Sequence, residues 1–284
     1  MRRFIHMFNS GSVSPDPVSI LWHSVCGHMV NVDFETGKSR WNAGSHRGVQ
    51  FLDKVEFPRK QKRYIFSPLF EIRHDTAFEE TIRGCASAPR DIKCWISPEL
   101  ERGLIELHRM GFAHSYEAWH EGKLVGGAFG IQLGSMISCD SMYHLMSNAS
   151  KAAYGQTLVH LQKRGFKVVD TNGVAEHQVN YGEEWIARWR FEHLIVDCLK
   201  DTPSFTDQRP CPKLPWEIKT LIPSLRPVRS IWRRMPWVKA PKSVLPESET
   251  DSKKEAVPPA AVSTEQSNPT EEIPKPGKPA APVS

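Results

Sequence analysis

Two aspartates follow short apolar runs that have the composition of β-strands. Residues 136–139 form the first run, which Asp140 follows, and residues 166–169 form the second, which Asp170 follows. The segment between the runs has the length and pattern of a helix, so together they predict a right-handed crossover joining parallel, neighbouring strands. The carboxyl ends of such strands lie side by side, where open α/β sheets bind ligands. The sequence therefore predicts two carboxylates in one cleft, although spacing alone fits turn or helix-cap aspartates equally well.

The predicted crossover helix is delimited by its own residues. Ser147 or Asn148 is a suitable N-cap, and Gly165 is a suitable end because glycine readily closes a helix in the left-handed conformation. The apolar residues of its buried face recur at helical spacing: Tyr154, Leu158 and Leu161.

A second helix is predicted between Ser97 and Gly111. Ser97 is a natural N-cap, Pro98 suits the first helical position, and Glu99 complements the positive end of the helix. Its buried stripe is formed by Leu100, Leu104 and Leu107. Trp95 precedes this helix, and packing is the simpler explanation for it than ligand contact.

The order of elements defines the expected fold class. Three runs typical of antiparallel strands follow the second helix, at residues 113–120, 124–132 and 136–142, and the crossover comes next. This predicts an α+β fold with a mixed sheet and flanking helices. Short strands are expected between residues 29 and 53, and a strand leading into a helix over residues 65–86. At least one more helix is expected after Asn172, with its apolar face at Ile186, Trp189, Leu194 and Cys198, whereas residues 1 to about 26 show no usable periodicity.

Composition and cysteine spacing indicate the cellular compartment of the protein and the partners that it does not need. The chain has 284 residues, of which 39% are hydrophobic, and a formal net charge of +5, which suits an anionic partner without proving one. No run approaches the ~18 apolar residues of a transmembrane helix, and the N-terminal apolar stretch is too short for a signal peptide. The six cysteines show neither CxxC pairs nor zinc spacing. These features predict a cytoplasmic protein without disulfides, metal or stable membrane association.

Two basic segments are candidates for contact with nucleic acid. The first is the basic cluster Arg59, Lys60, Lys62 and Arg63 beside Tyr64, which can hold phosphates but is equally typical of a solvated helix face. The second is residues 201–240, where eight Lys and Arg stand against three acidic residues and tryptophans are interleaved, a pattern that fits contact with RNA or with a membrane surface. From residue 241 to the end, nine of 44 residues are proline and few are apolar, so a disordered tail is expected.

Nucleotide, zinc-protease and serine-hydrolase motifs are absent from the sequence: there is no P-loop, GxGxxG, HExxH or GxSxG. The predicted sheet order resembles the GNAT acetyltransferase fold, whose coenzyme A loop has the form Q/R-x-x-G-x-G/A. The corresponding segment here is SMYHLMSNASKA, which lacks those glycines. Acetyl coenzyme A is therefore not the favoured acyl donor.

A closer resemblance covers residues from about Met29 to Leu199. Five segments are similar, in chain order, to motifs of the leucyl/phenylalanyl-tRNA–protein transferases, which are bacterial aminoacyltransferases with a GNAT-like core. These segments are WISPEL, HRMGFAHSYEAW, LVGGAFGIQLGSM, DSMYHLMSNASK and VVDTN. That family has WI-S-P-E, LH-x-x-G-x-AHS-x-E-x-W, LVGG-x-x-G, ES-M-F-x-x-x-x-NASK and D-x-Q. TGKSRW, HRGVQFLD and FPRKQKR resemble more weakly its small N-terminal domain, with TGE-x-RW and R-x-x-x-PLD. The family's G-x-F-P-M/W segment is not recognisable near residues 27–31.

The resemblance implies a GNAT-like core with a small N-terminal α/β domain, and transfer of Leu or Phe from aminoacyl-tRNA to proteins with N-terminal Arg or Lys. The product is an N-end-rule degradation signal, and an activated ester needs no ATP, metal or other cofactor to form the amide. Asp170 matches the catalytic aspartate, and Asn172 stands where the family has the glutamine of D-x-Q. Asp140 stands where the family has a glutamate that recognises the acceptor's cationic side chain.

The resemblance also implies a donor site. Trp95 matches an aromatic residue at the terminal adenosine of the tRNA, and Met142 and Val169 match the apolar pocket for the Leu or Phe side chain. The basic residues expected to face the tRNA are Arg59, Lys60, Lys62 and Arg63.

The expected organisation is a poorly defined segment (1–28), a small N-terminal domain (29–84), a GNAT-like catalytic domain (85–200), a basic extension (201–240) and a disordered tail (241–284), in a monomer. Two other functions fit the same residues. One is a GNAT-type transferase that uses aminoacyl-tRNA with a different acceptor. The other is a catalytically reduced homologue that binds RNA or degrons, which the replacement of the motif glutamine by Asn172 keeps open.

Overall fold

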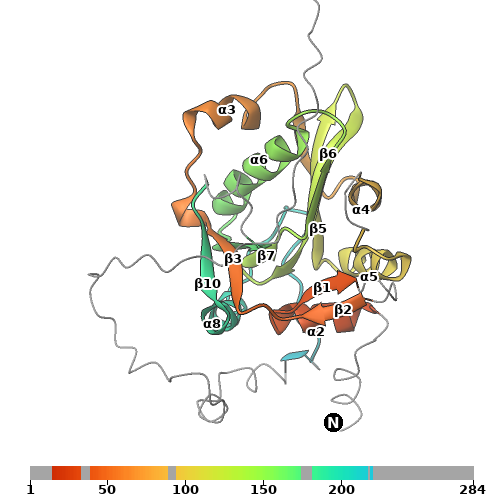
Figure 1. Ribbon diagram of the computed structural model, residues 1–284, viewed down its shortest axis with the longest axis vertical. Coiled ribbons are helices and arrows are strands. Elements are labelled where there is room, and N and C mark those ends of the chain that lie inside the picture. The colour runs from red at the N-terminus through yellow and green to blue at the C-terminus, as the bar shows by residue number, and fades with distance from the viewer. Residues whose placement is uncertain (1–14, 33–38, 89–93, 174–180, 217, 220–284) are drawn as a thin grey trace, which may run out of the picture. The chain divides into compact units, whose positions relative to one another are not determined.

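The computed structural model describes residues 15–32, 39–88, 94–173, 181–216 and 218–219 (Figure 1). A mixed sheet has the strand order β10-β3-β9-β7-β6-β5-β4, with β8 also paired to β6. Only β7 and β9 are parallel among the strand pairs of the described residues. The strands of this sheet are β3 (His46–Phe51), β4 (Glu71–His74), β5 (Ala113–His120), β6 (Lys123–Leu133), β7 (Met136–Ser138), β8 (Ser141–His144), β9 (Val168–Asn172) and β10 (Glu183–Ala187). The predicted α+β class with a mixed sheet is confirmed.

The predicted parallel pairing of the two strands joined by the crossover is confirmed. Strand β7 precedes α6 (Ala149–Lys163) in the chain, with β8 between them, and β9 follows α6. Strands β7 and β9 pair in parallel, with Ser138 opposite Asp170. Asn148 occupies the N-cap position of α6 but adopts a left-handed conformation (φ 67°) and makes no side-chain capping bond. Gly165 follows the helix with φ 86°, as expected of a glycine that ends a helix.

Helices cover both faces of the sheet. On one face α6 packs against β5 and β6, with α3 (Arg59–Ile65) against α6. The other face is covered by α2 (Pro17–Val25), α4 (Phe78–Ser87), α5 (Pro98–Arg109) and α8 (Arg188–Cys198). A hairpin of β1 (Met29–Val32) and β2 (Ser39–Asn42) lies beside α2 in Figure 1. Each face therefore has its own apolar core, and side chains that alternate along a strand enter different cores.

The sheet divides at Asp140. Strand β6 pairs with β7 through residues 132–133 and with β8 through residues 126–129, so β7 and β8 diverge where Asp140 joins them. Gly130 lies between the two pairings, and a Cβ there would come within 1.6 Å of the Ser138 carbonyl oxygen. Glycine at this position thus allows the close approach of the two strands that leaves Asp140 at the sheet edge.

Helix α5 follows the sequence prediction in detail. The Ser97 hydroxyl accepts a hydrogen bond of 3.2 Å from the Leu100 N–H, with Pro98 as first helical residue. All three leucines of the predicted stripe are buried, and Gly111 has φ 86°. Local capping chemistry and periodicity were sufficient here because both signals lie within the helix itself.

Two elements differ from expectation. Residues 17–25 form α2, although no usable periodicity was recognised in residues 1 to about 26. Asp16 caps this helix by accepting from Ser19 N at 3.0 Å, and Pro17 follows. This is the same cap-then-proline signal as in α5. Strand β10 was missed, so Ile186 belongs to that strand rather than to the helix that follows it. The predicted disorder of residues 241–284 lies outside the described residues, as do residues 33–38 within the stretch predicted to contain short strands.

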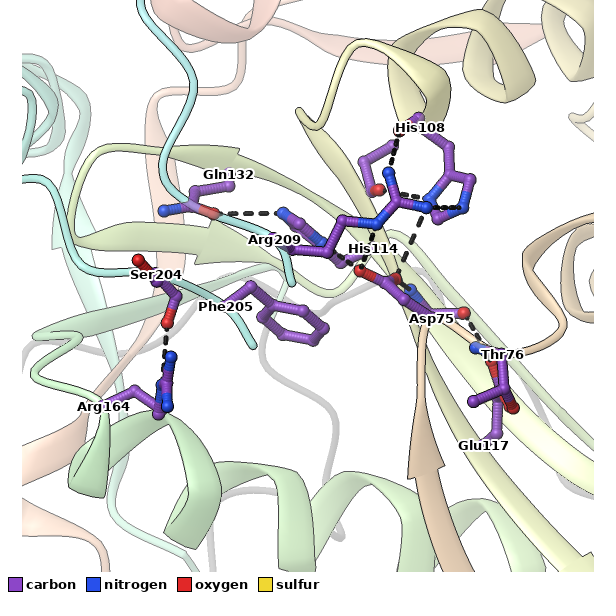
Figure 2. A network of polar contacts seen from close by, with 12 residues as sticks. Asp75, Thr76, His108, His114, Glu117, Gln132, Arg164, Ser204, Phe205 and Arg209 are labelled. Carbon is purple, nitrogen blue, oxygen red and sulfur yellow. Dashed lines mark hydrogen bonds and ion pairs between the residues drawn. The ribbon is translucent and has the colours of Figure 1, made fainter. Parts of the chain in front are cut away.

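Residues 203–209 form a strap across the edge of the sheet (Figure 2). Phe205 is 0% exposed and stacks on His114 with ring centroids 4.1 Å apart. Arg209 donates to the His108 carbonyl oxygen at 3.0 Å, and Gln132 donates to the Pro203 carbonyl oxygen at 2.9 Å. The beginning of the basic extension is therefore packed on the core.

Replacing Phe205 tests this packing. Phe205→Ala should lower the free energy of unfolding by about 3–5 kcal/mol, because it empties a fully buried aromatic site. The control is Trp216→Ala, since Trp216 is 71% exposed and its loss should change stability by less than about 0.5 kcal/mol. Urea denaturation followed by circular dichroism measures both. Equal, small effects would show that the strap adds little to the fold.

Candidate active site

A cavity of about 230 Å³ opens at the carboxyl ends of β7 and β9. Its polar wall consists of Arg47, Ser138, Asp140, Asp170 and Asn172. Much of its apolar wall consists of Trp41, Trp95, Leu100, Leu104, Ile131 and Met136. The two aspartates predicted to meet at this edge do meet, and the apolar surroundings lower the local dielectric around them.

Asp170 is held by a guanidinium. The Arg47 Nε atom donates to one carboxylate oxygen and Nη2 to the other, each at 2.7 Å. Both residues are 6% exposed. A bidentate fork in such a site is strong and directional, so Asp170 is a fixed carboxylate with its charge compensated.

Asp140 has a different environment. Its Oδ1 atom accepts from Asn172 Nδ2 at 3.1 Å, and its Oδ2 atom accepts from the Ser138 hydroxyl at 2.9 Å. Within the described part of the chain it pairs with no cation. Burial first, and then the nearby Asp170 charge, raise the pKa of Asp140 to about 6, although both hydrogen bonds favour the ionised form.

Asn172 joins the two carboxylates. Its backbone N–H donates to Asp170 Oδ1 at 3.0 Å while its side chain donates to Asp140. A bulge between Gly48 and Val49 interrupts the pairing of β3 and β9, and Asn172 adopts φ 63°. Asparagine tolerates this conformation well. Because its amide nitrogen is directed at Asp140, its amide oxygen is available to another donor.

A histidine pair contributes to the same cavity. His28 lines the cavity, and its Nδ1 atom lies 2.8 Å from Nδ1 of buried His23, which stacks on Trp41 at 4.0 Å. Burial, then the charges of Arg188 and Arg47, lower the pKa of His28 to about 4. Burial and His28 lower the pKa of His23 to about 3. At neutral pH this wall is therefore uncharged.

The predicted donor-site residues are divided between two faces of the sheet. Trp95, which the resemblance matches to an aromatic residue at the terminal adenosine, lines the cavity. Val169 is 0% exposed and packs in the core on the α6 side, and Met142 packs against the same core, so neither lines this cavity. Their assignment to the Leu or Phe pocket stays a prediction.

The four residues of the basic cluster lie on α3, which packs against α6: Arg59, Lys60, Lys62 and Arg63. Their side chains are exposed, and none forms an ion pair with another described residue. An exposed helix face with this charge fits both phosphate contact and simple solvation.

Three cavity residues escaped the sequence prediction. Arg47 is the arginine of the segment matched to R-x-x-x-PLD, which was a usable signal, but its partner lies 123 residues away. His28 falls in the segment where no family motif was recognised, and Trp41 ends the TGKSRW match. Only the tertiary structure brings them to the cavity.

The site combines one fixed, compensated carboxylate with one carboxylate that is open to a cation. Pairs of acids whose surroundings differ in this way commonly divide the work of a reaction between them. The class of protein that this suggests is an enzyme that binds a cationic or amine-bearing substrate beside an apolar wall. No described helix combines the length and the apolarity needed to span a lipid bilayer.

Comparison with known proteins identifies the family. The family model for leucyl/phenylalanyl-tRNA protein transferase matches residues 49–196. The protein named leucyl/phenylalanyl-tRNA–protein transferase from Gloeobacter violaceus is 42% identical over 159 residues, covering 56% of this chain and 81% of the relative. Those of Paramagnetospirillum magneticum and Synechococcus sp. are 35% and 33% identical, covering 58% and 61% of this chain and 79% and 90% of the relatives. The chain therefore belongs to this family and is an aminoacyltransferase.

Solved structures add nothing to this assignment. The structure of L-PGS from Bacillus licheniformis aligns with a TM-score of 0.33 at 11% identity, covering 45% of this chain and 44% of that one. A likeness at this level does not define a shared fold.

The raised pKa of Asp140 predicts a pH-dependent cost to stability. A carboxyl group whose pKa rises on folding, here from 3.8 to about 6, stabilises the fold most below pH 4, and this contribution is lost as pH rises through 6. Asp140→Asn should therefore raise the free energy of unfolding at pH 8 by roughly 2–3 kcal/mol, and the gain should vanish near pH 4. Urea denaturation at several pH values measures it, with exposed Asp53→Asn as control. A gain that does not vary with pH would contradict the assigned cause.

Proposed function

We propose that this aminoacyltransferase transfers Leu or Phe from aminoacyl-tRNA to the α-amino group of proteins that begin with Arg or Lys. The product would carry an N-end-rule degradation signal. The observation that supports this best is the asymmetry of the two aspartates: Asp170 is paired with Arg47, whereas Asp140 has hydrogen bonds but no cation among the described residues. A substrate cation beside Asp140 completes the balance of charge.

The reaction is aminolysis of an activated ester. The α-amine has an ordinary pKa of about 7.7–8.0, so a useful fraction is neutral at pH 7 and the enzyme mainly has to orient it. The amide oxygen of Asn172 is available to accept from the attacking amine because the amide nitrogen donates to Asp140. Asp170 supports that arrangement by holding the Asn172 backbone N–H at 3.0 Å.

The acceptor's first side chain is assigned to Asp140. An Arg or Lys cation there meets a carboxylate that already accepts two bonds, from Ser138 and Asn172, and that burial has made costly to ionise. Ion pairing in a partly buried site is worth more than at the surface, so the acceptor's charge contributes to selectivity. The same cation relieves the repulsion between Asp140 and Asp170.

The donor is assigned to the apolar and aromatic wall. Trp95 offers a face on which the terminal adenosine can stack, and a Leu or Phe side chain fits an apolar surface. The charged face of α3 is assigned to the acceptor stem of the tRNA. The proposal also includes a GNAT-like core, a small N-terminal domain at residues 29–84, a catalytic domain at residues 85–200, a monomeric state and a cytoplasmic location.

Peptide leucylation tests the acceptor assignment. Wild-type protein incubated with labelled leucyl-tRNA should leucylate peptides that begin with Arg or Lys and leave matched peptides beginning with Met almost untouched. Asp140→Asn should reduce kcat/KM for the Arg and Lys peptides by about 10- to 150-fold, because a charge-assisted hydrogen bond contributes roughly 1.5–3 kcal/mol. No transfer by the wild type to any peptide would refute the proposed function, and an unchanged selectivity ratio would remove Asp140 from acceptor recognition.

Salt dependence tests the role of α3. The double variant Arg59→Ala/Arg63→Ala should bind leucyl-tRNA more weakly whatever the tRNA sequence. Its plot of log affinity against log salt should be shallower by up to about one unit for each phosphate that the variant no longer neutralises. Lys163→Ala/Lys200→Ala removes the same charge from exposed positions on other parts of the chain and serves as control. Equal slopes in the two double variants would make the α3 face a solvated surface.

A further inference from the structure

We propose that Arg47 is a positioning residue of the transfer reaction: by fixing both oxygens of Asp170 it sets the orientation of Asn172 and leaves Asp140 as the carboxylate that receives the acceptor. This inference rests on the proposed function and adds to it a residue outside the segment that the family model matches, which begins at residue 49.

A series of hydrogen bonds leads from Arg47 to the reacting atoms. Arg47 donates to Asp170 through two bonds of 2.7 Å, and Asp170 Oδ1 in turn accepts the Asn172 backbone N–H at 3.0 Å. Asn172 then donates from its side chain to Asp140. Rotation of the Asp170 carboxylate would release the Asn172 backbone and so turn its amide away from the amine.

The Arg47 guanidinium is itself held in place by Phe191 and by the position of strand β3. Its Cζ atom lies 5.0 Å from the centroid of the Phe191 ring on α8, and strand β3 carries Arg47 beside β9 through the pairing of Gly48 with Asn172. A planar cation over an aromatic ring, with two of its nitrogens bonded to one carboxylate, has little freedom. The orientation of Asp170 is thus determined by the sheet and not by the substrate.

Stability alone does not account for this pair. Burying two charges usually costs about as much as their attraction returns, and apolar residues of similar size often stabilise a fold better. Here the guanidinium also keeps one buried nitrogen, Nη1, without a hydrogen-bond partner among the described residues, which adds to the cost. A costly ion pair on the wall of a cavity is more readily explained by its effect on the cavity.

Lysine is the informative replacement. Arg47→Lys keeps the positive charge, so no carboxylate is left uncompensated, but a single ammonium cannot reproduce the two parallel bonds of the fork. The change therefore separates orientation from charge. The matched control is Arg73→Lys, because Arg73 forms the same fork with Glu71, also with two bonds of 2.7 Å, on the edge strand β4 far from the cavity in the strand order.

The experiment measures leucyl transfer to Arg- and Lys-initiated peptides, with kcat expressed per functional leucyl-tRNA binding site so that misfolded protein is not counted. Arg47→Lys should lower kcat by about 10- to 100-fold, because small misplacements of reacting groups are costly. Its KM for leucyl-tRNA should stay within about twofold of the wild type. The selectivity for these peptides over matched peptides that begin with Met should be unchanged in Arg47→Lys, whereas Asp140→Asn should reduce it, since Arg47 does not contact the acceptor's side chain. Arg73→Lys should match the wild type.

Any other result would refute either the role of Arg47 or the proposed function. Full activity of Arg47→Lys in a background where the wild type leucylates Arg peptides would refute the role of Arg47 and leave the proposed function standing. Loss of the leucyl-tRNA binding sites or of the folded circular dichroism signal in Arg47→Lys would make the pair structural and also refute the role. A wild type that transfers Leu to neither peptide would refute the proposed function, and the role of Arg47 with it.

Discussion

The ion pair between Arg47 and Asp170 is the interaction on which the site depends. The parallel pairing of β7 and β9 brings two carboxylates to one edge of the sheet, and their apolar surroundings make two uncompensated negative charges unfavourable. Strand β3 lies on the other side of β9, and its Arg47 guanidinium compensates one of the two negative charges. The strand order and the charge balance therefore depend on each other. If a strand other than β3 lay beside β9, the two aspartates would lack the Arg47 cation.

The same constraint produces the asymmetry between the two acids. One cation cannot compensate two carboxylates equally, and the fork commits Arg47 to Asp170. Asp140 is left with neutral donors, which is why burial raises its pKa to about 6. The neutral histidines of the cavity add no charge to the balance, because burial and the charges of Arg188 and Arg47 lower the pKa of His28 to about 4. A substrate cation, as the proposed function requires, would compensate Asp140.

How far the sequence predicted this depends on the distance between cooperating residues. Helices α5 and α6 and the crossover were predicted because caps, glycines and apolar spacing are local signals. The meeting of Asp140 with Asp170 followed from the rule that two strands joined by a crossover helix run parallel and are usually neighbours. Arg47 was not predicted to join them, because its pairing with Asp170 spans 123 residues and depends on β3 inserting between β9 and β10. Helix α2 was a local signal that was overlooked, since Asp16 and Pro17 repeat the start of α5.

Two of the side chains that differ from the motifs of the resemblance, Asp140 and Asn172, are physically coupled. Asp140 replaces a glutamate and Asn172 replaces a glutamine, each shorter by one methylene, yet the two still meet at 3.1 Å. Asn172 is also the better residue for its backbone, since φ 63° suits asparagine more than glutamine. Because the two short side chains share one hydrogen bond, lengthening only one of them would displace that bond and with it the contact between the carboxylate and the amide.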